Sequence, residues 1–257
     1  MPLGLQVGGP VGDRGSGPVS GTAPDGRGGP HAFVADLTAP LLDEADHHHL
    51  ARVLRLRDGD AMTLGDGRGA WRSARFRLDP GMGPEAAGEV VEVAAPERPV
   101  TVAFSLIKGG RPELVVQKLT ELGVDQILPL AAERSVVRWD DTKAVANLGR
   151  FRRVAREAAM QSRRVHLPEV LALGEPADVA DGPAVALAES GGEPLGAPGA
   201  GPVDVVLVGP EGGWTDDELA GRRTVGLGST VLRAETAAIA AGTLLVALRD
   251  GRLTAQS

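Results

Sequence analysis

Residues 205–215 read VVLVGPEGGWT and decide the fold class of this chain. The apolar run Val205–Val208 leads into a glycine-rich turn, after which Thr215 and Glu218 stand at the spacing of a helix capping box. The segment therefore predicts a buried strand, a tight turn and a helix. Glycines there allow main-chain groups to approach a ligand closely, although a turn without any ligand would show the same pattern.

Strands and helices are expected to alternate on both sides of this segment. Pro112 in the first turn and Gly123 as the stop predict a helix over Arg111–Leu122, after a buried strand at Val100–Ile107. Further strands are expected at Ile127–Leu128, Ala184–Ala188 and Val225–Leu227, and further helices within Lys143–Arg164, at Thr215–Leu219 and at Ala234–Arg249. This order indicates an α/β domain over residues 97–254 with a parallel sheet, whose ligands bind beyond the carboxyl ends of the strands.

The N-terminal third of the chain has a different pattern. Short apolar segments separated by turns such as Asp58-Gly59-Asp60 predict a small, mostly β domain over residues 31–96. Residues 1–30 are rich in Gly, Pro, Ser and Asp and lack a hydrophobic period, so we expect a disordered extension there. We also expect its removal to leave stability nearly unchanged.

Composition excludes several classes of protein. The 257 residues include no cysteine, so disulfides and thiolate metal sites are absent, and no tyrosine, which disfavours an aromatic stacking platform for RNA. Neither a membrane span nor a secretory signal is expected, and we expect a cytoplasmic protein. The adjacent His47, His48 and His49 cannot easily converge on one ion, so no metal is predicted.

A second glycine-containing segment, LGSTVLRAETA, occupies residues 227–237. Gly226 and Gly228 begin a dinucleotide-binding pattern, but its third glycine and its later acidic residue are missing. Arg233 and Glu235 can form a simple ion pair in the first turn of the next helix. The region around residues 150–164 is rich in arginine, which suits either a solvated face or phosphate binding. We favour phosphate binding because this local positive charge is opposite in sign to the net charge of the chain, which is −7.

Four motifs in the C-terminal part occur together: QKLTELGV at 117–124, PLAAER at 129–134 and the two glycine-containing segments. With HHLARVLR at 48–55, they resemble the 16S ribosomal RNA uracil-N3 methyltransferase family of the SPOUT superfamily, from about His31 to Arg249. The resemblance implies a small PUA-like β-barrel domain, followed by a SPOUT-type parallel sheet with a C-terminal trefoil knot. It also implies a homodimer that uses S-adenosyl-L-methionine and acts on 16S ribosomal RNA, within the small ribosomal subunit.

The resemblance also assigns site residues. Arg233 would act on substrate or transition-state charge, and Glu235 would orient it. Cofactor binding falls on Leu187, Ala188, Glu189, Gly209, Pro210, Glu211, Gly212, Gly213, Leu227, Gly228, Val231 and Leu232. Together with the basic helix, it places RNA contacts at Arg52, Arg55, Arg134, Arg152, Arg156, Arg163 and Arg164. The chain departs from the pattern at Arg163, where many relatives have glycine, and at Thr230, where relatives often carry arginine.

Two other functions remain open from the sequence. One is a different knotted methyltransferase that acts on tRNA or on the ribose 2′-oxygen, which the N-terminal domain and the motif order disfavour. The other is a ribosome-assembly factor that binds RNA without catalysis, which the intact Leu232-Arg233-x-Glu235-Thr236 disfavours.

Overall fold

The computed structural model describes residues 19–109 and 111–253. These residues divide into two compact units, which we call the N-terminal unit (residues 19–96 and 157–167) and the C-terminal unit (residues 97–156 and 168–253). Within the described part of the chain, none of the helices combines the length and apolar character needed to cross a bilayer.

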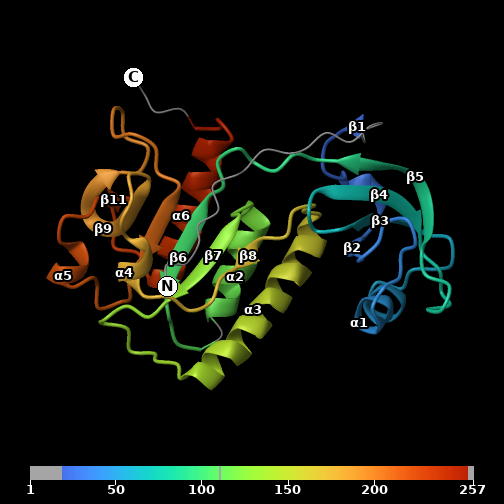
Figure 1. The fold of residues 1–257 in the computed structure, drawn as a ribbon, viewed down its shortest axis with the longest axis horizontal. Coiled ribbons are helices and arrows are strands. Elements are labelled where there is room, and N and C mark those ends of the chain that lie inside the picture. Colours follow the sequence, from blue (N-terminus) through green and yellow to red (C-terminus); the bar gives the residue numbers. More distant parts are fainter. Residues whose placement is uncertain (1–18, 110, 254–257) are drawn as a thin grey trace. The chain divides into compact units, whose positions relative to one another are not determined.

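A six-stranded sheet forms the centre of the C-terminal unit (Figure 1), with the order β11-β9-β10-β6-β7-β8. All neighbouring strands in it are parallel. The strands are β6 (Thr101–Ser105), β7 (Gln126–Leu130), β8 (Glu169–Val170), β9 (Val185–Pro194), β10 (Val205–Val208) and β11 (Thr224–Gly226). The predicted parallel α/β sheet is therefore confirmed.

Helices cover one face of this sheet. They are α2 (Arg111–Leu122), α3 (Asp141–Ser162) and α6 (Ala234–Arg249), whose apolar side chains share a core cluster with Val102, Phe104 and Val206. The other face packs against α4 (Pro176–Val179) and Trp214, next to the short α5 (Asp216–Leu219). Because both faces are covered, nearly every residue of β6 and β10 is buried, which is why these strands read as continuous apolar runs.

Close packing of α2 against α6 depends on small residues. A Cβ atom on Gly242 would lie 2.6 Å from Leu119 Cδ2, so any larger residue at this crossing would displace the Leu119 side chain. Ala238 and Ala241, both fully buried, extend the close contact along α6. The sequence predictions for α2, α6 and β10 agree with the structure at both ends, whereas the two-residue β8 and the four-residue α4 were missed because they are too short to show a period.

The N-terminal unit contains a five-stranded sheet in the order β1-β5-β4-β3-β2. Its elements are β1 (Val19–Ser20), the 3-10 turn η1 (Gly26–Gly28), β2 (His31–Phe33), α1 (Glu44–His48) with its continuation η2 (His49–Val53), β3 (Ala61–Gly65), β4 (Ala70–Arg75) and β5 (Glu85–Glu92). Met62, Leu64 and Phe76 form the centre of its core. Strands β3, β4 and β5 pair antiparallel, as the turns between them predict.

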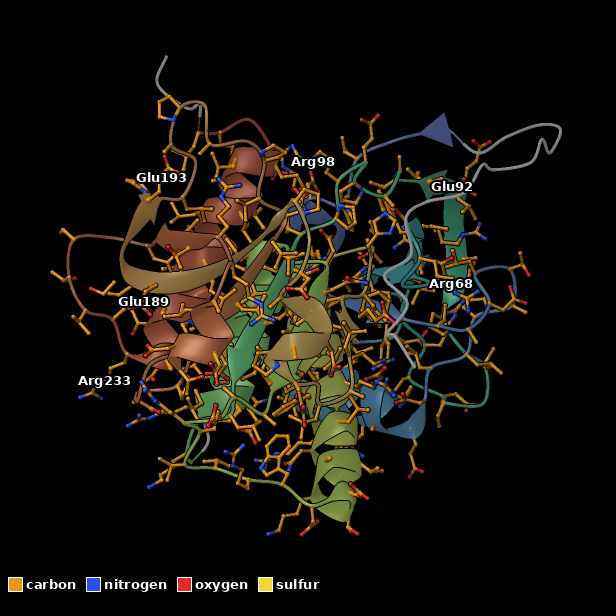
Figure 2. All side chains as sticks on the ribbon, turned by 60° about the vertical axis from the view of Figure 1, so that its left-hand side comes forward. Arg68, Glu92, Arg98, Glu189, Glu193 and Arg233 are labelled. Atoms are coloured by element: carbon orange, nitrogen blue, oxygen red, sulfur yellow. The ribbon has the colours of Figure 1, made fainter. Side chains whose placement is uncertain are left out.

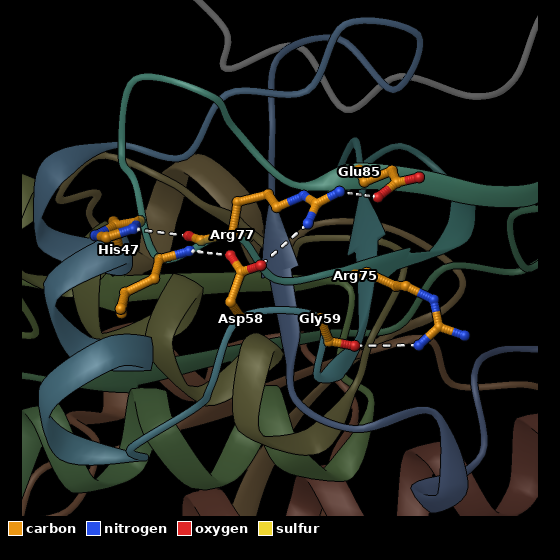
Figure 3. A network of polar contacts seen from close by, with 7 residues as sticks. His47, Asp58, Gly59, Arg75, Arg77 and Glu85 are labelled. Carbon is orange, nitrogen blue, oxygen red and sulfur yellow. Dashed lines mark hydrogen bonds and ion pairs between the residues drawn. The ribbon is translucent and has the colours of Figure 1, made fainter.

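Polar contacts fix the turn around Asp58 (Figure 3). Asp58 accepts hydrogen bonds from the Leu78 main chain at 2.9 Å and from Arg77 Nη1 at 3.1 Å, and these contacts hold the pKa of its carboxyl below the usual range. The other guanidinium nitrogen of Arg77 pairs with Glu85, and His47 Nε2 lies 3.1 Å from the Arg77 carbonyl oxygen. His47, the first of the three adjacent histidines, therefore belongs to the scaffold of this unit.

The last turns of α3 belong to the N-terminal unit, where Arg163 ends the helix. Its φ is +56°, and the Arg164 N–H donates to the Ala159 carbonyl at 2.9 Å, the pattern of a left-handed helix stop. Glycine adopts this conformation most readily, so an arginine here is unusual. Arg163 Nε and Nη2 both donate to the Gly29 carbonyl oxygen, at 3.2 and 3.1 Å.

The predicted disordered extension is wrong for residues 19–30; residues 1–18 lie outside the described part. Strand β1 pairs with β5, and Trp71 Nε1 donates to the Thr22 carbonyl oxygen at 2.9 Å. The neighbouring His31 is buried. Burial, and secondarily the charge of Arg163, lower its pKa to about 4, so it is neutral at neutral pH. The apolar pattern did not reveal these contacts because most of them use main-chain oxygens.

We therefore expect removal of residues 1–29 to destabilise the protein more than removal of residues 1–18. Removal of residues 1–29 deletes the acceptor of Arg163 and β1, one of the two strands that pair with β5. The loss of the charged hydrogen bonds alone should cost about 1.5–3 kcal/mol. Calorimetric melting should show a clear decrease in Tm for this variant, compared with a matched truncation of residues 1–18. Equal melting temperatures for the two truncations would contradict the assigned role of residues 19–29.

Candidate active site

A pocket of about 180 Å³ lies where the middle of β9 meets the segments that follow β10 and β11, at the carboxyl edge of the sheet. We call it the glycine-loop pocket. It is lined by Ala188, Glu189, Ser190, Val208, Gly209, Pro210, Glu211, Gly213, Trp214, Leu227, Gly228, Thr230, Val231, Leu232, Ala234 and Ala237. The two segments singled out in the sequence, residues 208–215 and 227–237, thus face the same space although they are separated along the chain.

Trp214 forms a rigid side of this pocket. It is 3 % exposed, and its Nε1 donates to the Ala188 carbonyl oxygen at 3.0 Å, which ties the segment after β10 to β9. A Cβ atom on Gly209 would lie 3.0 Å from the indole ring, so glycine allows the turn to pack directly on the ring. Sequence reasoning missed Trp214; the available signal was a large aromatic residue immediately after two glycines.

The turn itself is held by Arg134 from the opposite side. Arg134 Nη1 donates to the Trp214 carbonyl oxygen at 2.9 Å and to the Gly212 carbonyl oxygen at 3.3 Å. A Cβ atom on Gly212 would meet Arg134 Cβ at 3.2 Å, so Gly212 faces the arginine, whereas Gly213 has a φ of +70° and lines the pocket. Arg134, predicted as an RNA contact, braces the turn in this structure.

Ten of the twelve predicted cofactor-binding residues line the pocket. The two others are Gly212, which packs on Arg134, and Leu187, which is fully buried in the core on the α4 side of the sheet. The side chain of Leu187 points away from the pocket because successive residues of a strand face opposite sides. Besides Trp214, the lining residues not predicted are Ser190, Val208, Thr230, Ala234 and Ala237.

All charged side chains that line the pocket are acidic. Glu189 and Glu211 contribute carboxylates, and none of the lining residues is Lys, Arg or His. Apolar side chains, among them Leu227, Val231 and Leu232, make up much of the remaining wall. Such a pocket suits a ligand that combines an apolar planar part with a positive charge.

Arg233 and Glu235 flank the pocket without lining it. Arg233 is the N-cap residue of α6, directly after Leu232, and its exposed side chain extends into solvent (Figure 2). Glu235 lies two residues further along the helix, with its side chain 14 % exposed, and Oε1 is 3.4 Å from Arg111 Nη1. The sequence suggested an ion pair between Arg233 and Glu235, but Glu235 of α6 pairs instead with Arg111 of α2. Sequence reasoning missed Arg111.

The predicted RNA-contacting arginines fall into two groups. Arg52 and Arg55, in the N-terminal unit, are exposed, and their side chains make no hydrogen bond or ion pair with the described residues. The others are engaged within the protein: Arg152 Nε donates to the Val170 carbonyl oxygen at 3.3 Å, Arg156 and Arg164 take part in interactions, and Arg163 holds Gly29. Arg163 thus has a structural role that the sequence did not predict.

Comparisons with known proteins agree with this arrangement. Residues 95–246 match the model of an RNA methyltransferase domain, and residues 42–77 match that of an RNA methyltransferase PUA domain. The chain is 38 % identical to ribosomal RNA small subunit methyltransferase E of Mycobacterium bovis, over 78 % of this chain and 83 % of that protein. It is 32 % identical to the Bacillus subtilis protein of the same name, over 80 % and 91 %.

A solved structure has the same fold. The crystal structure of ribosomal RNA small subunit methyltransferase E from Neisseria gonorrhoeae, bound to S-adenosyl methionine, superposes with a TM-score of 0.70 at 28 % identity, covering 85 % of this chain and 97 % of that chain. With the PUA domain match, it identifies the N-terminal unit as PUA-like and the C-terminal unit as the methyltransferase domain. The chain belongs to the RNA methyltransferase family that includes ribosomal RNA small subunit methyltransferase E.

Proposed function

We propose that this protein transfers a methyl group from S-adenosyl-L-methionine to N3 of a specific uridine in 16S ribosomal RNA. The observation that carries the proposal is the glycine-loop pocket, which joins apolar walls, main-chain groups of strand β9 and of the loops after β10 and β11, and two carboxylates. The relatives named for small-subunit ribosomal RNA methylation, and the solved relative bound to S-adenosyl methionine, support the same activity.

The residues of the pocket fit this cofactor. S-adenosyl-L-methionine has a planar adenine and a positively charged sulfonium, and it would supply the methyl group. Leu227, Val231 and Leu232 would provide apolar surface for the adenine, and the main chain around Gly209 and Gly228 would be open to hydrogen bonds with its edge, because neither residue has a side chain. Glu189 and Glu211 favour the positive charge of the ligand over a neutral analogue.

Arg233 is assigned to the uracil. N3 of uracil loses its proton to solvent when it takes up the methyl group, and a guanidinium beside the ring would stabilise the negative charge that develops there in the transition state. Arg233 follows the pocket residue Leu232 directly and stands at the positive end of the α6 dipole. Glu235 orients this turn through its pair with Arg111. No covalent protein nucleophile is needed, since methyl transfer is a single displacement that depends on positioning.

The finer assignments of fold and partners belong to the same proposal. They are a trefoil knot around the glycine-loop pocket, a closed barrel in the PUA-like unit, a homodimer, and the small ribosomal subunit in the cytoplasm as the substrate. The sheet order, in which β11 pairs with β9 and not with β10, is compatible with a knotted C-terminus. The exposed Arg52 and Arg55 support an RNA backbone contact by the PUA-like unit.

The proposed reaction is tested on the modified nucleoside itself. Purified protein, S-adenosyl-L-methionine and small ribosomal subunits from a strain lacking this gene should yield 3-methyluridine, identified by nucleoside mass spectrometry after digestion. The same strain should lack this nucleoside in 16S RNA and regain it on complementation. A 2′-O-methylated nucleoside would assign a different knotted methyltransferase activity, and binding of RNA without cofactor heat in calorimetry would indicate an assembly factor.

A further inference from the structure

A second pocket, of about 240 Å³, opens beside α2 in the C-terminal unit and shares no lining residue with the glycine-loop pocket. We call it the Trp139 pocket. It is lined by Ile107, Lys108, Gly109, Pro112, Glu113, Val137, Trp139, Asn147, Arg150 and Phe151. These residues come from the segments that follow β6 and β7 and from two helices, α2 and α3.

One carboxylate oxygen of Glu113, in this pocket, lacks a hydrogen-bond donor within the described part of the chain. Its side chain is 17 % exposed, and Oε1 accepts from Arg150 Nη1 at 2.9 Å. Its Oε2 is buried and has no hydrogen-bond partner among the described residues. A buried carboxylate oxygen without a donor is costly, so a ligand that brings N–H groups to Glu113 would satisfy it.

The rest of the lining suits a nucleotide. Trp139 is partly buried and packs on Phe151, with ring centroids 5.8 Å apart, so it offers a fixed aromatic surface to the pocket. Lys108 is exposed, and the side chain of Arg150 is 61 % exposed. When base N–H groups take the place of Arg150 at Glu113, the guanidinium can turn outward to a phosphate, which leaves both partners of the original ion pair satisfied.

The two pockets lie along one edge of the sheet. Ser105 Oγ at the end of β6 donates to the Val208 carbonyl oxygen at the end of β10 at 3.0 Å, so the segments leading to the Trp139 pocket and to the glycine-loop pocket leave neighbouring strands. Neighbouring strands are only about 5 Å apart. A single-stranded RNA whose target base is at the glycine-loop pocket can therefore place another nucleotide in the Trp139 pocket.

We propose that the Trp139 pocket binds a guanine nucleotide of the RNA substrate, close to the base that is methylated. Guanine presents two adjacent N–H donors, N1–H and N2–H, to a carboxylate, whereas adenine and cytosine place an acceptor beside their amino group and uracil flanks its N–H with two carbonyls. Glu113 is the specificity residue, Trp139 the stacking surface, and Lys108 with Arg150 the phosphate contacts. This inference rests on the proposed RNA methylation and adds a sequence requirement to it.

Nucleotide titration of the full-length protein tests the pocket without any methyl transfer. The chain has three tryptophans, so the indole N–H signals of a ¹⁵N spectrum can be assigned by single Trp→Phe variants. Guanosine 5′-monophosphate should shift the Trp139 signal with an affinity about tenfold or more above that of the adenosine, cytidine and uridine monophosphates. Inosine monophosphate, which lacks the 2-amino group, should be intermediate.

A matched pair of variants tests the role of Glu113. Glu113→Gln replaces one acceptor by a donor and should remove the preference for guanosine monophosphate. Glu121→Gln is the control, because Glu121 is an ion-paired glutamate of the same helix that does not line the pocket. Unchanged Trp71 and Trp214 signals would show that both variants remain folded.

Three results would overturn the inference: a Trp139 signal unmoved by millimolar nucleotide, an equal response to all four monophosphates, or a guanine preference retained in Glu113→Gln. The proposed function would fail in a different way, through the absence of 3-methyluridine or of cofactor binding. These titrations measure neither, so the two failures can be distinguished.

Discussion

Replacement of Arg233 by alanine should slow methyl transfer by about a hundredfold or more, as expected for the loss of a positioned charge in a transition state. The affinity for S-adenosyl-L-methionine should change little, because Arg233 is not among the residues that line the glycine-loop pocket. Arg233 is exposed at the N-cap of α6, and among the described residues nothing is hydrogen-bonded or ion-paired to its side chain. Its charge is therefore available to a substrate placed at the mouth of the pocket.

Single-turnover kinetics with saturating RNA and cofactor measure this effect directly. Arg233→Lys should recover part of the rate, since it retains the charge without the planar guanidinium. Arg252→Ala is a suitable control, because Arg252 is an exposed arginine of the same unit, 80 % exposed in its side chain and remote in sequence from the pocket loops. An Arg233→Ala enzyme that binds RNA weakly but performs the chemical step at the normal rate would refute the assigned role.

Gly213→Val should reduce the affinity for S-adenosyl-L-methionine by about tenfold or more, equivalent to about 1.4 kcal/mol. Two causes act together. Gly213 has a φ of +70°, where a β-branched residue is strained by about 1–3 kcal/mol, and any relaxation of this strain displaces a turn that lines the pocket. A valine side chain that stays in place would also fill space that the ligand needs.

Gly221→Val separates these effects from general destabilisation. Gly221 has the same φ of +70° and, like Gly213, has open space where a Cβ atom would lie, but it belongs to the turn after α5 and does not line the pocket. Both variants should lose similar stability in thermal melting, whereas only Gly213→Val should bind the cofactor weakly in calorimetry. Equal cofactor affinities for the two variants would show that the pocket has been placed on the wrong turn.

Local sequence patterns located most of the candidate site but not the orientation of each residue in it. Ten predicted cofactor residues line the glycine-loop pocket because a family motif retains the positions of turns, and turns are marked in sequence by glycine and by capping residues. Leu187 was included although it belongs to the core, because a motif gives the segment but not the face of the strand that each residue occupies. Gly212 and Gly213 are neighbours in the motif, yet only the second lines the pocket.

By itself, the sequence determined the alternation of strands and helices, the parallel sheet and the loops that carry the site, because hydrophobic period and turn residues are local properties. Tertiary structure alone decided the partners of the charged side chains: Arg134 on the Trp214 turn, Arg163 on Gly29, and Arg111 on Glu235. The first two contacts join residues that are 78 to 134 positions apart, and their acceptors are main-chain oxygens, which every residue possesses. A guanidinium binds whichever acceptor the fold brings within about 3 Å, and the linear pattern contains no record of that acceptor.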